Sequence, residues 1–485
     1  MLRGRSPRRG GCTVALDDAE IGFMPARPLA ADIAARRISP VEVTQAVLRR
    51  VEQLEPALNA FAWVDGEGAL AAARQAETAV MRGDALGPLH GLTVTIKDLM
   101  AAKDLPLGRG SHAFDGVVAT EDAAVVARLR QAGAIIIGKT TTSEFGWSAV
   151  SRSPPRGITH NPWQHGMNAG ASSAGAGVAA AAGFGALHQG SDGAGSVRLP
   201  AHFCGVVGLK PTFGRVPYAP PGNNDYMSHI GPLTRTVDDT ALMFSVMAGA
   251  HPWDHTTLDG VVDCTPPALA GGVRGLRIAF SPDLGVAHVD PEVAGLVAAA
   301  ARAFEELGAS VETVTPPWGA LGPDLIRYFW PAHMSAYAPY LPEFADRMDP
   351  GLVAAIRASE GGRVDEYVAM RARKHAYAMA VAKWFEEWDL LLTPSAGVAA
   401  FPAELLMPES APQHEWDWMT SWADFSYPFN MAQNPAISVP CGFTSAGLPV
   451  GLQIVGQRLD DAGVLRAAYA FEAARPWADR RPPIG

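Results

Sequence analysis

A run of small residues between positions 170 and 198 restricts this chain more than any other segment. It starts with GASSAG at 170–175, continues as an Ala/Gly-rich stretch to residue 183, and ends with GSDGAGSVR at 190–198. The Ala/Gly-rich stretch predicts a helix whose small side chains allow close packing against a sheet. The small residues on both sides of it let a carbonyl group approach the backbone, where helix and loop N–H groups are available.

Strand and helix patterns alternate along the chain. Apolar residues alternate with threonines over 92–96, which is typical of a strand with one buried face, and Lys97 follows it. A helical pattern at 122–131 and a short apolar strand at 134–137 come next, an order that favours a right-handed crossover between parallel strands. No long low-complexity linker interrupts the alternation. We therefore expect one large α/β domain over 21–485, with a mixed, mostly parallel central sheet covered by helices.

Charge and hydropathy exclude several classes of protein. Residues 1–20 carry a cluster of arginines with no apolar stretch behind it, which predicts a disordered basic tail and argues against a secretion signal. No run of about 18 apolar residues occurs, so no membrane span is expected. The net charge of −10 gives no support to a nucleic-acid partner. A cytoplasmic protein fits these features.

Cysteines and histidines show no metal-binding pattern. The 4 cysteines are far apart, and the 13 histidines are scattered without pairing. Unpaired, widely spaced cysteines fit a reducing compartment. We expect no metal and no cofactor. The cysteines are Cys12, Cys204, Cys264 and Cys441.

Three side chains offer the parts of a serine nucleophile activated without histidine. Lys97 ends an apolar strand, where burial lowers the pKa of an amine enough for it to act as a base. Ser172 precedes the Ala/Gly helix, and Ser196 follows a loop of small residues whose N–H groups can bind an oxyanion. Each residue alone has an ordinary structural explanation: a surface lysine, a helix cap and a turn, respectively.

The combination resembles the amidase signature family, from about Leu29 to Phe471. The central stretch from Gly170 to Pro211 is the most specific part of the resemblance. Further matching motifs are GPLHG at 87–91, GKT at 138–140, FCGVVGLKPT at 203–212, GPLTRT at 231–236 and GLPVGLQ at 447–453.

The resemblance implies a single amidase-signature domain with a Ser–cis-Ser–Lys triad. Ser196 would be the nucleophile, and Ser172, preceded by a cis peptide bond, would pass its proton to neutral Lys97. Water would then hydrolyse the acyl-enzyme. The oxyanion hole would consist of the backbone N–H groups of Gly193, Ala194, Gly195 and Ser196.

This sequence departs from the family pattern at three glycine positions, which hold Ala171, Ala174 and Ala194. Each adds one methyl group and disfavours a positive φ, so a slightly narrower but functional site is expected. Asp192 and Arg198 flank the nucleophile, and an internal ion pair is favoured over a direct catalytic role.

Three variable regions are expected to form the substrate pocket: 217–228, 320–350 and 402–430. Their aromatic side chains indicate a hydrophobic or aryl substrate, either an amide or a carbamate, although many aromatics are also expected in the core. The expected substrate is a small molecule, and the expected oligomeric state is a monomer or homodimer. The candidate substrate-binding residues are Gly170, Ala171, Tyr218, Asn223, Trp416 and Trp422.

Two other classes remain open at this point. The family includes the amidase subunit of a tRNA-dependent amidotransferase, which needs partner subunits and a polar pocket of glutamine size. The other is a non-catalytic binding protein on the same fold. The aromatic residues argue against the first, and the complete set of Lys97, Ser172 and Ser196 argues against the second.

Overall fold

The computed structural model of the protein describes residues 16–220, 222 and 225–484. Within them, 11 strands form one sheet in the order β1-β3-β2-β6-β8-β7-β12-β13-β11-β9-β10, and β4 and β5 form a separate two-stranded sheet. The strands are β1 Phe61–Val64, β2 Thr93–Lys97, β3 Ile135–Thr140, β4 Arg152–Ser153, β5 Gly157–Ile158, β6 Leu187–Asp192, β7 Val207–Lys210, β8 His229–Thr234, β9 Arg277–Phe280, β10 Ser310–Thr313, β11 Leu390–Pro394, β12 Ala436–Phe443 and β13 Pro449–Gly456.

Helices make up most of the remaining regular structure. The α-helices are α1 Asp18–Gly22, α2 Ala26–Ala34, α3 Pro40–Leu58, α4 Gly66–Arg82, α5 Ala124–Gln131, α6 Ala174–Ala182, α7 Arg198–Cys204, α8 Val237–Met247, α9 Pro266–Leu269, α10 Pro291–Glu306, α11 Gly322–Met334, α12 Leu341–Phe344, α13 Pro350–Arg357, α14 Val364–Trp384, α15 Met419–Trp422, α16 Pro428–Met431 and α17 Asp461–Ala474. The 3-10 helices are η1 His112–Phe114, η2 Glu144–Gly146, η3 Gly319–Leu321, η4 Ser335–Tyr340 and η5 Ala345–Arg347.

The single α/β domain and the mixed sheet are confirmed, but the expected majority of parallel strands is wrong. Parallel pairs join β2 to β3 and β6, and β9 to β10 and β11. The other neighbouring pairs of the large sheet are antiparallel. A physical reason is visible at β12 and β13, where the connection over 444–448 is too short for the crossover that parallel strands need.

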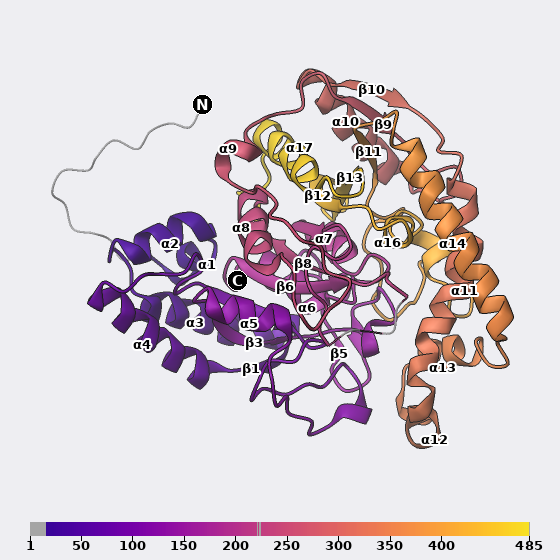
Figure 1. Cartoon of the computed structure of the whole chain (residues 1–485). Helices are drawn as coiled ribbons and strands as arrows, with labels where there is room; N and C mark the ends of the chain where they lie inside the picture. The colour runs from indigo at the N-terminus through magenta and orange to yellow at the C-terminus, as the bar shows by residue number, and fades with distance from the viewer. Residues whose placement is uncertain (1–15, 221, 223–224, 485) are drawn as a thin grey trace.

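Helices cover both faces of the sheet. In β3, Ile135 and Ile137 pack in one hydrophobic cluster with α6, whereas Ile136 packs in another with α5 and α8. Successive strand residues point to opposite faces, so this division places helices on each side. Helices α11–α14 gather at one side of the molecule, away from α1–α4 (Figure 1).

The start of the described chain changes the expected domain boundary. Residues 1–15 lie outside the described residues. The last part of the expected tail, however, belongs to α1, where Asp17 and Glu20 form a reciprocal capping box. The ordered domain thus begins before residue 21.

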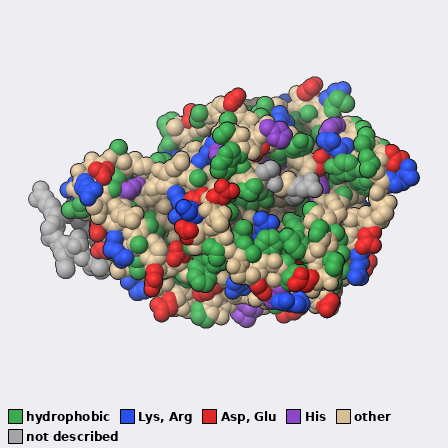
Figure 2. Space-filling model, turned by 60° about the horizontal axis from the view of Figure 1, so that its bottom comes forward, with side chains coloured by type: hydrophobic (Ala, Val, Ile, Leu, Met, Phe, Trp, Pro, Cys, Tyr) green, Lys and Arg blue, Asp and Glu red, His purple; other side chains and the backbone are tan. Residues whose placement is uncertain are grey.

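None of the described helices is long and apolar enough to cross a membrane. On the face shown in Figure 2, acidic and basic side chains are interspersed with hydrophobic ones, and no extended basic patch is visible among the described residues.

Candidate active site

Parallel strand pairing brings the candidate lysine to the segment that follows β6. Lys97 is the last residue of β2, and β6, its parallel neighbour, ends at Asp192. The carboxyl ends of parallel strands meet at the same edge of a sheet, where α/β folds place their sites. The backbone N–H of Lys97 also donates to Gln189 Oε1 on β6 at 3.0 Å, which holds the strand end in place.

The Lys97 side chain is buried among hydroxyl groups. Its Nζ atom lies 2.7 Å from Ser172 Oγ, 2.9 Å from Ser173 Oγ and 3.0 Å from Ser191 Oγ, so a neutral amine can donate two of these hydrogen bonds and accept the third. Lys97 is fully buried, and it forms no ion pair with any described carboxylate. Burial lowers the pKa of Lys97 well below its usual range, and the charge of Asp192 opposes this shift only in part. The environment therefore favours a neutral amine.

Ser172 lies in the turn that leads into α6. The peptide bond between Ala171 and Ser172 is cis, as the family resemblance implied. The helix can approach the neighbouring backbone closely because Gly175 has no side chain. A Cβ atom at Gly175 would lie 2.0 Å from the Ala60 carbonyl oxygen and 2.5 Å from the Thr141 nitrogen. The small residues of this segment thus place Ser172 within reach of Lys97.

Ser196 lies next to this turn in the loop between β6 and α7. Its carbonyl oxygen accepts a hydrogen bond from the Ser173 N–H at 3.2 Å, which joins the two serine segments. Ser196 is 3% exposed, and its hydroxyl makes no hydrogen bond to a described residue. The structure thus brings the three predicted residues into one region. It contains the Lys97–Ser172 hydrogen bond, and no described hydrogen bond joins the Ser172 and Ser196 side chains.

A buried ion pair holds the loop that carries Ser196. One edge of the Arg198 guanidinium donates to both oxygens of Asp192, with Nη2 to Oδ1 at 2.9 Å and Nε to Oδ2 at 3.0 Å. Asn430 and Gln453 complete the network by accepting hydrogen bonds from Arg198 at 2.7 Å. Burial alone would raise the pKa of Asp192, but Arg198 holds it well below its usual range. These contacts support a structural role for the pair.

Asp192 also uses one of the expected oxyanion-hole donors. The Gly195 N–H donates to Asp192 Oδ1 at 2.7 Å, so this group is already occupied. The N–H groups of Gly193, Ala194 and Ser196 donate to no described residue. Gly195 has a φ of +115°, a conformation that favours glycine. The loop therefore keeps the other predicted donors unused.

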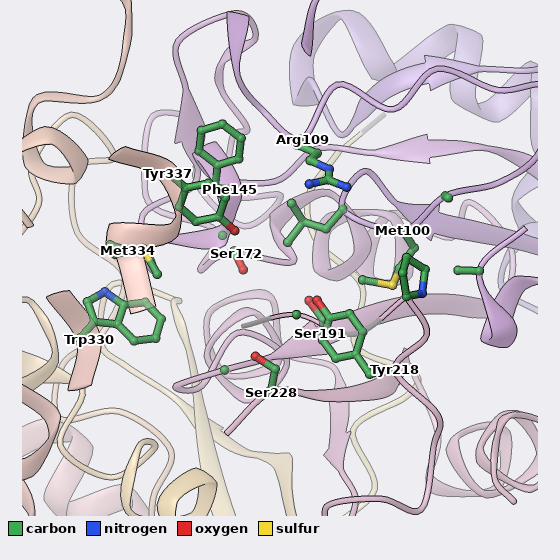
Figure 3. A pocket seen from close by; sticks show the side chains of 17 residues that line it. Met100, Arg109, Phe145, Ser172, Ser191, Tyr218, Ser228, Trp330, Met334 and Tyr337 are labelled. Atoms are coloured by element: carbon green, nitrogen blue, oxygen red, sulfur yellow. The ribbon is translucent and has the colours of Figure 1, made fainter. Parts of the chain in front are cut away.

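A cavity of about 220 Å³ opens beside Ser172 (Figure 3). Ser172, Ser191 and Gly193 line one part of it, whereas the Ser196 side chain is not among the lining residues. Most of the other walls are aromatic or apolar. The remaining lining residues are Leu99, Met100, Ala101, Arg109, Ala123, Phe145, Gly146, Tyr218, Pro220, Gly222, Ser228, Trp330, Met334 and Tyr337.

Two of the three variable regions reach this cavity. Tyr218 comes from the predicted region 217–228, and Trp330 and Tyr337 come from the predicted region 320–350. Gly170 and Ala171 are buried beside Ser172 and do not line the cavity. Asn223 lies outside the described residues.

The Trp-rich connection at 402–430, the third region expected to form the substrate pocket, contributes no residue to the lining of this cavity. Trp422 is fully buried, donates from Nε1 to the Leu406 carbonyl oxygen and packs against Phe203. Trp416 lines a different cavity on the other side of α11. A tryptophan in a short connection is equally suited to line a pocket or to pack in the core. Trp422 packs in the hydrophobic core.

The alanines that replace family glycines do not narrow the cavity. Ala171, Ala174 and Ala194 are each at most 1% exposed and none of them lines it. Ala194 packs in the hydrophobic cluster that also contains Phe203. Their methyl groups therefore fill core space, contrary to the expected narrowing of the site.

Sequence reasoning missed several residues of the site. Ser173 and Ser191 contact Lys97. Both lie inside the sequence motifs described above, next to Ser172 and Asp192, and this position could have identified them. Arg109 and Phe145 also line the cavity, Arg109 from the segment between β2 and η1 and Phe145 from η2, and neither was among the residues expected to form the pocket. In the described part of the chain, no group of three or more His, Cys, Asp or Glu side chains is arranged to hold a metal ion.

Comparison with known proteins finds a family model, relatives and solved structures that each match most of this chain. The sequence model of the Amidase family matches residues 42–465. An acylamidase from Rhodococcus erythropolis is 39% identical over 96% of this chain and 98% of its own length. A glutamyl-tRNA(Gln) amidotransferase subunit from a Cyanothece species is 32% identical over 94% and 99%, respectively. The crystal structure of a bacterial aryl acylamidase superposes with a TM-score of 0.88 at 28% identity, covering 94% of this chain and 97% of that one.

Proposed function

This chain belongs to the amidase signature family of hydrolases that act on amides, and we propose that it cleaves aryl and other hydrophobic amides through a serine acyl-enzyme. The observation that carries the proposal is the buried hydrogen bond between Lys97 and Ser172 beside a cavity with aromatic walls. A buried amine without a carboxylate partner is suited to accept a proton.

In the proposed first step, Ser196 attacks the amide carbonyl carbon. Its proton moves to Ser172 while the Ser172 proton moves to the neutral amine of Lys97. The lysinium then returns a proton by the same route to the leaving amine, and the C–N bond breaks. A water molecule, deprotonated by the same relay, hydrolyses the ester at Ser196 and restores the enzyme.

Backbone N–H groups would stabilise the negative charge that develops on the substrate oxygen. The unused N–H groups of Gly193, Ala194 and Ser196 are the proposed donors. Gly195 is proposed to act mainly through its bond to Asp192, which keeps the loop in one conformation. The Asp192–Arg198 pair supports this geometry because both of its members are fully buried and bound to several elements.

The cavity supports the aryl preference. Phe145, Trp330 and Tyr337 present aromatic surface near Ser172, and such surface favours a flat apolar group over a small polar one. The similarity to an acylamidase and to an aryl acylamidase agrees with this preference. A carbamate presents the same carbonyl group to the same donors, so aryl carbamates are proposed as a second substrate class.

A transferase role is the main alternative, because an amidotransferase subunit is also similar to this chain. That role requires a pocket suited to glutamine. The four aromatic side chains that line the cavity, Phe145, Tyr218, Trp330 and Tyr337, favour hydrolysis of a hydrophobic amide instead. A purely binding function is disfavoured because Lys97, Ser172 and Ser196 are all present and lie in one region.

Hydrolysis of a matched panel tests the proposal. The panel is a 4-nitroanilide, a short aliphatic amide, glutamine and an aryl carbamate, each with the wild type, Ser196→Ala and Ser245→Ala. We expect turnover of the anilide, lost by about 10³-fold or more in Ser196→Ala. The exposed Ser245 on α8 serves as the control, and its variant should keep full activity.

Each other outcome has a distinct meaning. Activity on glutamine alone would favour the transferase class. Full activity of a folded Ser196→Ala variant would remove Ser196 as the nucleophile. Absence of labelling of the wild type by a fluorophosphonate, together with no turnover, would favour the binding protein.

A further inference from the structure

We propose that Arg109 binds a carboxylate of the substrate, so that the preferred amides are anionic. This inference rests on the proposed function, because it concerns the same cavity. It adds a specificity-determining residue that the motifs around Lys97, Ser172 and Ser196 do not contain.

Charge in the cavity points to this residue. Arg109 is the one formally charged side chain among the described lining residues, and no Asp or Glu is among them. Figure 3 shows the Arg109 guanidinium directed into the same space as Ser172 and Tyr218. With the Lys97 amine neutral, the cavity carries a net positive charge and attracts an anionic group.

The guanidinium makes no hydrogen bond within the described part of the chain. Its Nε atom is buried without an acceptor, and Arg109 forms no ion pair with a described residue. The nearby Asp98 accepts a hydrogen bond from the Arg109 backbone N–H, but its carboxylate is paired with Lys139. The Lys139 Nζ atom lies 3.1 Å from Asp98 Oδ1. A buried donor without an acceptor costs free energy, and a carboxylate can accept two parallel N–H bonds from one edge of the guanidinium.

The backbone of Arg109 is held firmly at the site. Its N–H donates to the Asp98 carbonyl oxygen at 3.2 Å, and its own carbonyl oxygen accepts from the Phe145 N–H at 2.9 Å. The guanidinium carbon lies 4.6 Å from the ring centroid of Phe114. The two backbone hydrogen bonds and the contact with the Phe114 ring therefore position the side chain before any substrate binds, which lowers the entropic cost of binding.

An aryl group and a carboxylate fit different parts of this cavity. The aromatic walls would hold the ring, and Arg109 would hold the charge. The carboxylate can belong to the acyl part or to the amine part of the amide. The chemistry at Arg109 is the same for both, and matched substrates distinguish them.

The test uses pairs of anilides that differ by one carboxylate. Succinyl 4-nitroanilide is compared with butyryl 4-nitroanilide for the acyl side, and 4-acetamidobenzoate with acetanilide for the amine side. We expect the wild type to prefer the charged member of at least one pair. In Arg109→Met, kcat/KM for that member should fall by about 10-fold or more, whereas the neutral member changes little.

Two further variants keep the test interpretable. Arg109→Lys retains the charge but not the planar fork, so it should restore part of the preference. Arg37→Met removes an arginine that is 61% exposed and should leave both members of each pair unchanged. Equal losses for charged and neutral members in Arg109→Met, or a wild-type preference for the neutral members of both pairs, would overturn the inference.

Failure of the proposed function gives a different result. If the wild type turns over no member of either pair, the chemistry is wrong, and binding of 3-phenylpropionate is measured by tryptophan fluorescence. Binding that is weakened about 10-fold in Arg109→Met would still support the carboxylate site. Equal binding by the wild type and Arg109→Met would overturn it.

Discussion

Tyr337 stacks on Phe145, with ring centroids 4.2 Å apart and an angle of 12° between the ring planes. The two residues belong to η4 and η2, which are distant in the chain, and together they form an aromatic wall of the cavity beside Ser172. Figure 3 shows both rings at one side of this cavity. The aryl specificity proposed above depends on this wall.

Replacing Tyr337 with leucine should weaken the preference for aryl amides. We expect kcat/KM for a 4-nitroanilide to fall by about 3- to 10-fold relative to an aliphatic amide, because a ring–ring contact contributes about 0.5–1.5 kcal/mol. Tyr328→Leu is the matched control, since Tyr328 lines the other cavity beside α11. Equal losses for both amides in Tyr337→Leu would argue against an aryl-binding wall.

Lys97→Met should change how stability depends on pH. The unfolded chain binds a proton at this lysine below about pH 10.5, whereas burial lowers the pKa of Lys97 in the folded protein. Between these two pKa values folding releases a proton, so the wild type gains stability as pH rises, and the methionine variant lacks this gain. Urea unfolding from pH 7 to pH 10 should show a wild-type free energy of unfolding that rises relative to Lys97→Met. The exposed Lys103→Met is the control, and a parallel pH profile in Lys97→Met would contradict a depressed pKa.

The buried ion pair should be costly to break. Asp192→Asn leaves the charge of Arg198 without a carboxylate inside the protein, and we expect a loss of about 3–5 kcal/mol in the free energy of unfolding. Glu306→Gln breaks an exposed pair with Arg475, at 2.6 Å, and should cost less than about 1 kcal/mol. Chemical denaturation measures both variants. Similar small losses would show that the Asp192–Arg198 pair does not hold the loop.

Two helical glycines should respond oppositely to alanine. Gly175→Ala places a methyl group against the Ala60 carbonyl oxygen, so we expect a lower melting temperature and reduced hydrolysis. Gly295 lies in α10 with no atom within 4 Å of the position that an added methyl group would take, and Gly295→Ala should stabilise the protein by about 0.5–1 kcal/mol. Thermal unfolding compares the two. A neutral Gly175→Ala would mean that α6 can move away from Thr141 without loss.

Local sequence was sufficient for the catalytic candidates. Lys97, Ser172 and Ser196 were recognised because each is part of a short motif with a fixed order of residue types. The alternation of polar and apolar residues also located β2, since a strand buries alternate side chains. Both signals depend only on neighbours in the chain, which is why they can be identified without a structure.

Tertiary packing decided the orientation of the strands and the walls of the cavity. Hydrophobic periodicity marks a strand as buried, but the same pattern serves parallel and antiparallel pairing, so the sheet contains more antiparallel pairs than expected. Trp422 and Trp330 are equally apolar in sequence, yet one packs in the core and the other lines the cavity. Burial is encoded locally, whereas the partner of a buried side chain is set by segments far away in the chain. The sequence alone therefore identified the candidate catalytic residues, and only the folded structure placed Arg109 and Phe145 near them.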